Sequence, residues 1–372
     1  MSQAALAERC QVSREAVSNW LSGESRPRPL KLKAIAETLG IDVTSLLKSD
    51  LSNVPVVAYR TKKKEPATDS SLAAAKELAM QLRQLVPFVH TTHFTPSRLD
   101  SPQVDHDYVY DVTQAIRHRL CLSKNEPVSR EQLLNLHHEF GSILVPVRWA
   151  GDRTGHENAL SVYLPDSKSS WVVFSLNARN DDFNYWLAHE LAHCYTLHVL
   201  SGDTGEDFAE IFAQELLFPT DAATAAIDEI FSHPDPVTRA HYLADAYNIS
   251  VVTVIKQTER TAKAAGKEFV SLQTDKFWSE WNVTRELVPT VSRALFGKDE
   301  IEVGNYIETA EVIFKTPIFS AIAQWQQAEN GRSPAFISSV LNVGLEEAME
   351  LSHILIQRAR THNIGANSPK SC

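Results

Sequence analysis

Several features that would place this chain in a specialised class are scarce or missing in its 372 residues. Its 4 cysteines are far apart and form no CxxC pair, so neither a disulfide framework nor a thiolate zinc site is expected. No run of about 18 apolar residues is present, and the first residues lack the basic and apolar regions of a signal peptide. We therefore expect a cytoplasmic protein that has no membrane partner.

Charge is distributed unevenly along the chain. The formal net charge is -10, yet residues 1–66 contain 11 Lys+Arg and 7 Asp+Glu, whereas the remainder contains 25 and 39. A basic N-terminal segment on an acidic body indicates that only this segment meets nucleic acid. The length predicts two or three domains.

The most informative motif is His-Glu-Leu-Ala-His at residues 189–193, in a segment without glycine or proline from 182 to 200. Such a segment predicts a helix, in which His189 and His193 project from one side about one turn apart. That spacing lets both imidazoles bind one zinc ion, and Glu190 points to the neighbouring side, where it can hold the attacking water. The alternative is a buried helix with two hydrogen-bonded histidines.

A zinc site on this motif needs a third protein ligand and an open fourth position. The sequence predicts a second helix from about 205 to 218, started by a capping box of Thr204 and Asp207. Glu206 and Glu210 lie one turn apart on this helix. We predict that Glu206 binds the metal and that Glu210 orients a ligating imidazole. The reverse assignment and a simple pair of surface charges remain open.

Residues from about 109 to 219 resemble the ImmA/IrrE family of zinc metallopeptidases. The motifs that carry the resemblance are Leu-Ala-His-Glu-Leu-Ala-His at 187–193 and Glu-x-x-Ala-x-x-Phe-Ala-x-x-Leu-Leu-Phe-Pro at 206–219. In the family pattern, the position that matches Glu206 is the third zinc ligand. The position that matches Glu210 is usually Asn or Asp, so glutamate is a departure there.

The resemblance implies a zinc-dependent endopeptidase that cleaves a partner repressor with its own helix–turn–helix domain, thereby switching on gene expression. Zinc peptidases also need a side chain that polarises the scissile carbonyl, and Tyr195, His156 and Tyr163 are candidates between which the sequence does not choose. A rival interpretation is a DNA-binding regulator or antitoxin whose metallopeptidase domain does not cut and only binds a partner.

Residues 2–47 have the pattern of short helices and turns that is typical of a helix–turn–helix domain. Ser13 is placed to cap a second helix whose polar residues gather near its N-terminus, as a recognition helix in the major groove requires. Lys31 and Lys33 follow this helix and could bind phosphates. The residues that we predict to contact DNA are Gln3, Ser13, Arg14, Glu15, Ser18, Asn19, Arg26 and Arg28.

This N-terminal segment resembles the repressor-type helix–turn–helix domain of the Xre/Cro family, and a head of this type joined to a metallopeptidase domain is common in the ImmA/IrrE family. The resemblance rests on the Ser-Gln opening, Val12-Ser13 at the turn and Val17-Ser18-Asn19-Trp20 in the recognition helix. Family members normally carry a further helix before the Ser-Gln, at which this chain begins. Either that helix lies upstream or the domain is weakened. A helical protein-interaction module without DNA binding is the alternative.

We predict an α+β fold that is predominantly α, with a small helix–turn–helix head, a zincin-like metallopeptidase domain with a small sheet, and a helical C-terminal region. A substrate in extended form could pair with an edge strand at 160–164 or at 172–177. The C-terminal region could sense or recognise the partner, or act as a structural cap. The predicted boundaries are a DNA-binding domain at 1–50, a linker at 51–71, the metallopeptidase domain at 72–235 and the C-terminal domain at 236–372.

Regular elements are expected throughout the two larger regions. Short runs rich in β-branched and aromatic residues predict strands, and apolar residues at helical spacing predict helices. The predicted strands are 143–147, 158–164 and 171–176, and the predicted helices of the C-terminal region are 236–247, 250–265, 277–295, 305–326 and 345–361.

Overall fold

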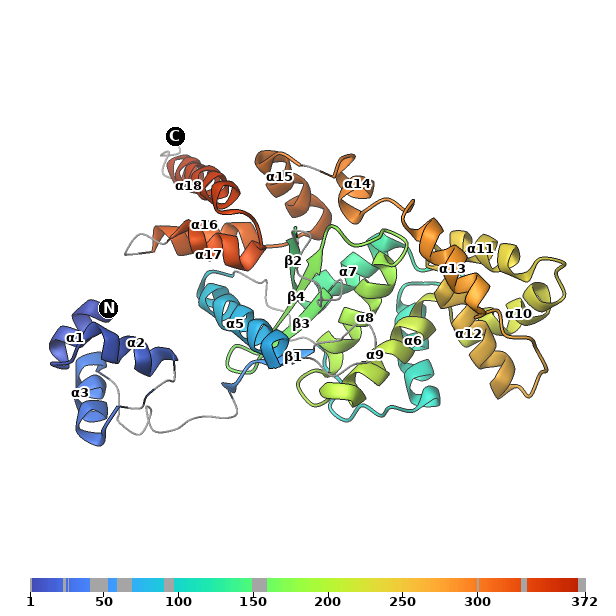
Figure 1. The fold of residues 1–372 in the computed structure, drawn as a ribbon, viewed down its shortest axis with the longest axis horizontal. Coiled ribbons are helices and arrows are strands. Elements are labelled where there is room, and N and C mark those ends of the chain that lie inside the picture. Colours follow the sequence, from blue (N-terminus) through green and yellow to red (C-terminus); the bar gives the residue numbers. More distant parts are fainter. Residues whose placement is uncertain are drawn as a thin grey trace, which may run out of the picture. The chain divides into compact units, whose positions relative to one another are not determined.

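The computed structural model confirms an α+β fold that is predominantly α (Figure 1). The chain divides into two compact units, Met1–Val54 and Pro55–Cys372. No helix among the described residues is long and apolar enough to cross a membrane. The structure describes residues 2–22, 25, 27–40, 53–58, 69–89, 97–148, 159–299, 301–328 and 333–366, without the side chains of 22, 69–71 and 360–366.

The described residues of the first unit include three short helices, α1 (Gln3–Arg9), α2 (Arg14–Ser22) and α3 (Pro29–Leu39). The Ser13 hydroxyl accepts a hydrogen bond from the Ala16 amide at 3.1 Å, which caps α2 as the sequence predicts. Among the residues of this unit that the structure describes, Ala7, Cys10, Val17, Ile35 and Ala36 are buried.

In the described part of the chain, the second unit is built around a sheet of four strands in the order β1-β3-β4-β2. Its strands are β1 (Val56–Ala58), β2 (Ile143–Val147), β3 (Ala159–Leu164) and β4 (Ser169–Ser175). The β3–β4 pair is antiparallel, β2 runs parallel to β4, and β1 pairs antiparallel with β3. The strand β1 lies inside the segment that the sequence predicts as a linker.

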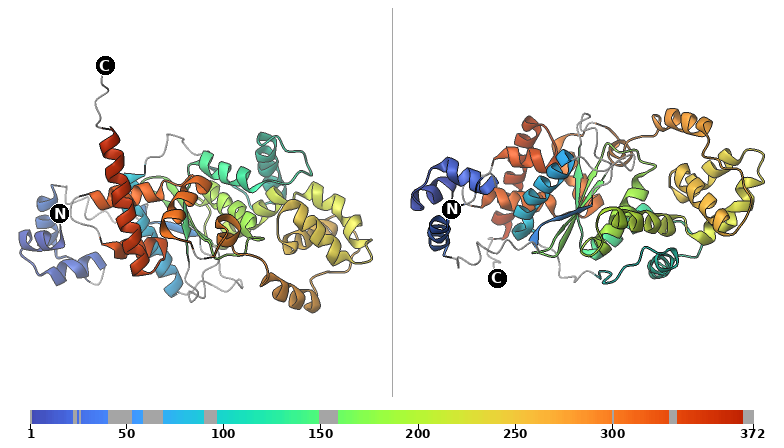
Figure 2. Two further views of the ribbon diagram at one scale, coloured as in Figure 1. Left: turned by 90° about the horizontal axis from the view of Figure 1, so that it is seen from above. Right: turned by 60° about the horizontal axis from the view of Figure 1, so that its bottom comes forward.

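Helices cover both faces of this sheet (Figures 1 and 2). One face carries α5 (Asp69–Leu85), which contacts β1 and β3 and packs beside α16 (Ile318–Gln327) and α17 (Pro334–Leu341). The other face carries α8 (Phe183–Thr196), which contacts β3 and β4. The helices α7 (Arg130–Phe140) and α9 (Gly202–Leu217) pack against α8, and α6 (His106–Arg119) packs against α9.

The remaining helices form two groups, one that follows α9 in the chain and one that lies near the sheet. The helices α10 and α11 both pack on α12, and α18 packs against α15, α16 and α17. Their bounds are η2 (Val86–Phe88), α10 (Thr220–Phe231), α11 (Pro236–Tyr247), α12 (Val251–Ala264), α13 (Asp275–Arg285), α14 (Val291–Phe296), α15 (Val303–Phe314) and α18 (Leu345–Ala366).

Several predicted elements need correction. The predicted helix 277–295 is two helices, α13 and α14, and 305–326 is α15 and α16, because Pro289 and Pro317 interrupt them. The capping box at Thr204 is wrong, since α9 begins at Gly202. A Cβ on Gly205 would meet the Leu200 carbonyl oxygen at 3.2 Å, so glycine lets the first turn of α9 lie close to the segment that connects it to α8.

Candidate metal centre

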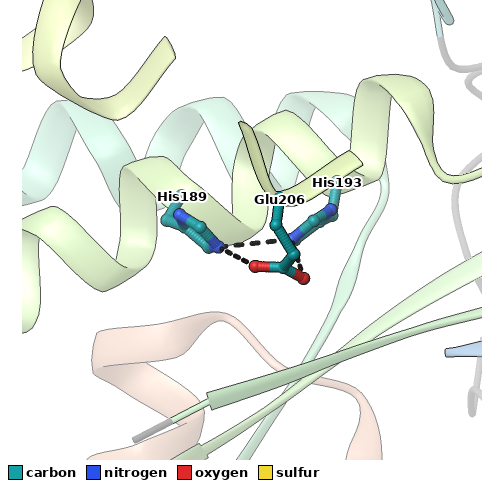
Figure 3. Close-up of side chains that lie close together, drawn as sticks. All are labelled: His189, His193 and Glu206. Carbon is teal, nitrogen blue, oxygen red and sulfur yellow. Dashed lines mark hydrogen bonds and ion pairs between the residues drawn. The ribbon is translucent and has the colours of Figure 1, made fainter. Parts of the chain in front are cut away.

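Two helices bring three potential metal ligands together. His189 and His193 extend from α8, one turn apart, and Glu206 faces them from the first turns of α9 (Figure 3). Among the described residues, these three form the only group of at least three His, Cys, Asp or Glu side chains close enough to hold one ion. The structure therefore brings together the three residues that the sequence predicts as ligands.

The spacing of the ligand atoms fits tetrahedral coordination. The His189 Nε2 atom lies 3.2 Å from Glu206 Oε2, His193 Nε2 lies 3.3 Å from Glu206 Oε1, and the two Nε2 atoms are 3.3 Å apart. Zinc with tetrahedral ligands at about 2.0–2.1 Å has neighbouring ligand atoms about 3.3 Å apart. Two imidazoles and one carboxylate fit zinc and leave a fourth position open.

The electrostatics of the Glu206 carboxyl also suit a ligand. Burial acts to raise its pKa, but hydrogen bonds and charge attraction from His189 and His193 outweigh burial and hold the pKa well below its usual range. The side chain of Glu206 retains 19% exposure, whereas the two imidazoles retain 1% and 2%. An ionised carboxylate at the partly open side of two buried imidazoles is a favourable place for a cation.

The Glu190 carboxylate is buried beside this cluster, and a residue of the sheet binds it. The Ser161 hydroxyl on β3 donates a 2.5 Å hydrogen bond to Glu190 Oε2. Ser161 precedes Glu190 by 29 residues, so this contact joins the predicted proton acceptor to a strand that is distant along the chain. Sequence reasoning missed Ser161, because no spacing rule relates a strand residue to a distant helix residue.

Glu210 lies outside the cluster of three ligands. Burial lowers the pKa of Arg260 on α12. Charge attraction from Glu210 acts in the opposite direction, so the two side chains are close enough to interact. The same guanidinium lies 2.7 Å from Glu215, a fully buried carboxylate. The placement favours Glu206 over Glu210 as the metal ligand, and the role of Glu210 in orienting a histidine stays a prediction.

Polar contacts from three separate segments of the chain hold α8 in position. The His137 Nε2–H of α7 donates to the Leu187 carbonyl at 2.8 Å, and Arg98 donates to the Cys194 carbonyl at 3.2 Å. Arg285 of α13 pairs with Asp182, the residue just before α8. Burial raises the pKa of the Cys194 thiol to about 12, so this cysteine is a packing residue.

The three candidates for carbonyl polarisation fare differently. Tyr195 is buried against Phe140 and Phe212, and Tyr163 lies under the Arg98 guanidinium at 4.6 Å. His156 lies outside the described residues. Sequence reasoning overlooked Tyr185, whose ring stacks on His189 with centroids 6.0 Å apart. The signal available was its position four residues before the first histidine.

The predicted edge strands for substrate require correction. Both β3 and β4 lie inside the described sheet, because β3 stands between β1 and β4, and β4 stands between β3 and β2. The short strand β1 covers the outer edge of β3. Neither 160–164 nor 172–177 is therefore a free edge strand in this structure.

Five of the predicted DNA-contacting residues lie in α2 or just before it, Gln3 begins α1, and Arg28 precedes α3. Gln3, Ser13, Arg14, Glu15, Ser18 and Arg28 are exposed, Asn19 is half-buried, and Arg26 lies outside the described residues. Lys31 instead donates hydrogen bonds to the carbonyls of Cys10 and Gln11 at 2.9 and 3.2 Å. This lysine therefore holds the turn between α1 and α2.

Comparison with known proteins identifies the N-terminal unit. A family model described as helix-turn-helix matches residues 1–46. No curated protein matches the chain. The chain therefore carries a helix–turn–helix head of the kind found in DNA-binding regulators. The match ends before the candidate metal centre, so the metallopeptidase domain stays a prediction.

Proposed function

We propose that this protein is a zinc-dependent endopeptidase with a DNA-binding head, which cleaves a partner transcriptional repressor and so switches on gene expression. The observation that carries the proposal is the tetrahedral spacing of the ligand atoms of His189, His193 and Glu206, with the Glu190 carboxylate buried beside them. The resemblance of residues 109–219 to ImmA/IrrE peptidases supports the choice of a helix–turn–helix repressor as substrate.

Each side chain of the site has a distinct task in this proposal. His189, His193 and Glu206 would hold zinc, which when bound supplies a Lewis acid for the scissile carbonyl and lowers the pKa of water towards neutrality. Glu190 accepts a proton from the attacking water and later delivers it to the leaving amine. Ser161 binds one oxygen of Glu190 and so restrains the orientation of the carboxylate.

The substitution Glu190→Gln tests the enzyme. The variant keeps the shape of the side chain and all three ligands, so we expect about one zinc per chain and cleavage slower by at least about 100-fold. Elemental analysis measures the metal, and mass spectrometry measures new termini in purified helix–turn–helix repressors from the same genome. Glu280→Gln, an exposed glutamate on α13, is the matched control. Cleavage by Glu190→Gln at the wild-type rate would contradict the proposed role.

A second candidate function is a DNA-binding regulator or antitoxin whose metallopeptidase domain binds a partner without cutting it. It is favoured by the helix–turn–helix match, which concerns the head alone. Sequence-specific DNA binding that persists in Glu190→Gln, together with no repressor cleaved by the wild type, would select this candidate.

A further inference from the structure

The strand β1 lies directly beside the residues of the proposed active site. Its register with β3 places Ala58 opposite Ser161, Val57 opposite Val162 and Val56 opposite Tyr163. Since Ser161 donates to Glu190, Ala58 is paired with the residue that holds the proposed proton acceptor. The strand also contacts α9, the helix that carries Glu206, and Figure 1 shows it at the edge of the sheet near α9.

The faces of the two strands are fixed by their pairing. Residues directly opposite each other in an antiparallel pair point to the same face. Ser161 points towards α8, so Ala58 does as well, and both are buried. Val57 points to the opposite face and packs against the hydrophobic core there. The chain thus presents a short extended segment, with a small side chain facing the catalytic side, on the outer edge of β3.

An extended substrate peptide beside this metal centre needs the same strand edge. Strand addition supplies main-chain hydrogen bonds to a peptide of any sequence, and this mode requires an edge without a partner. In the described structure the edge of β3 is taken by only three residues, Val56–Ala58, although β3 extends from Ala159 to Leu164. A longer peptide can pair with more of β3 than β1 does.

We propose that β1 is an internal occupant of the peptide-binding edge of β3, and that an extended protein substrate binds by displacing it. This inference rests on the proposed peptidase function for its biological purpose, but the occupancy of the edge can be tested without cleavage. Because β1 begins two residues after Val54, where the first unit ends, events at the helix–turn–helix head are covalently linked to this strand.

A release variant tests the occupancy by binding. Val57→Pro removes an amide N–H and fixes φ in the middle of β1, so it disfavours pairing with β3. The probe is a fluorescein-labelled peptide that copies residues 53–58, and its anisotropy is measured with the full-length, zinc-loaded chain in a Glu190→Gln background. We expect the Kd of the labelled peptide to be at least tenfold lower for the chain with Val57→Pro than for the chain with an unchanged β1. Val54→Pro, a valine outside β1, is the matched control and should bind as the wild-type strand does.

A locking variant keeps the test valid even where Val57→Pro does not fold. Val57→Cys combined with Val162→Cys places two thiols opposite each other, on the face away from Ser161. Oxidation should abolish probe binding, and with Glu190 intact it should slow cleavage of labelled casein at least tenfold, with recovery after reduction by a phosphine. The single Val57→Cys variant should not respond to oxidation.

The outcomes separate the two ideas. Equal probe binding and equal cleavage in the oxidised and reduced forms would overturn the occupancy of the edge by β1. Probe binding that appears on release and disappears on locking, without cleavage in any form, would support the occupancy while contradicting the proposed peptidase.

Discussion

The Ser161 hydroxyl on β3 donates a 2.5 Å hydrogen bond to the Glu190 carboxylate on α8. Both side chains are buried, so the bond fixes one oxygen of the carboxylate where water cannot replace the donor. The contact makes the sheet part of the proposed catalytic apparatus. In the proposed mechanism, the geometry of proton transfer therefore depends on β3 as well as on the two helices that carry the proposed zinc ligands.

Removing this bond should slow the reaction without removing the metal. We expect Ser161→Ala to lower kcat about tenfold with zinc content and KM little changed, because the carboxylate loses its orientation but not its proximity to the substrate. Ser175→Ala, a buried serine of β4, is the control. An unchanged kcat in Ser161→Ala would show that the bond has no positioning role.

Acid should destabilise the fold through His137, which packs α7 against α8. Burial lowers the pKa of this imidazole to about 4, although its hydrogen bond to the Leu187 carbonyl acts in the opposite direction. The neutral form of His137 is favoured in the folded state. Its contribution to the free energy of unfolding is therefore fully present above the unfolded pKa of about 6.5 and is lost as the pH falls towards 4. We expect a loss of about 3 kcal/mol over this range. Urea unfolding of wild type and His137→Gln at pH 7 and pH 4.5 measures it, and an equal pH dependence in the two proteins would rule out this histidine as the source.

Arg117 should be a strong determinant of stability. Its guanidinium is buried and donates to the carbonyls of Leu216, Ser123 and Glu126 at 2.6–2.8 Å, which ties α6 to the end of α9. Arg117→Met leaves these carbonyls without that donor and should lower the free energy of unfolding by about 3 kcal/mol. Arg119→Met is the control, since the Arg119 side chain is 54% exposed. Similar urea midpoints for the two variants would contradict this account.

The first unit offers two basic residues with different predicted roles. Arg28 is exposed, so Arg28→Ala should weaken binding to non-specific duplex DNA and reduce the slope of log affinity against log salt by about 0.9. Lys31 is bonded to the carbonyls of Cys10 and Gln11, so Lys31→Ala should lower the stability of the unit by about 1 kcal/mol. Anisotropy of labelled DNA at several salt concentrations, with thermal unfolding, separates the two effects. An unaltered salt slope in Arg28→Ala would remove it from the DNA contact.

Elements with a strong period were predictable from the sequence. The strands at 143–147, 159–164 and 169–175 carry runs of β-branched and aromatic residues, and the helix of the His-Glu-Leu-Ala-His motif has no breaker. The sequence predicted one helix in place of α13 and α14, and one in place of α15 and α16. Pro289 and Pro317 indicate these two interruptions, which the prediction did not use. The start of α10 directly after Pro219 was likewise readable.

Other features depend on contacts that sequence spacing does not encode. The strand β1 has only three residues and stands in a segment with no period, so its pairing with β3 follows from the tertiary fold alone. The bond from Ser161 to Glu190 and the stacking of Tyr185 on His189 are of the same kind. By contrast, the position of Glu206 beside the two histidines was predictable, because helical periodicity and the chemistry of zinc restrict the choice to two glutamates.

Zinc content tests the central claim most directly. Elemental analysis of purified wild type, Glu206→Ala and Glu210→Ala uses two glutamates one turn apart on the same helix, which makes each a control for the other. The account predicts about one zinc per chain in the wild type and in Glu210→Ala, and a marked loss in Glu206→Ala, because only Glu206 places its oxygens 3.2 and 3.3 Å from the two histidine Nε2 atoms. A wild type that binds no zinc when supplied with it, or a Glu206→Ala variant that keeps it, would contradict the proposed metal centre.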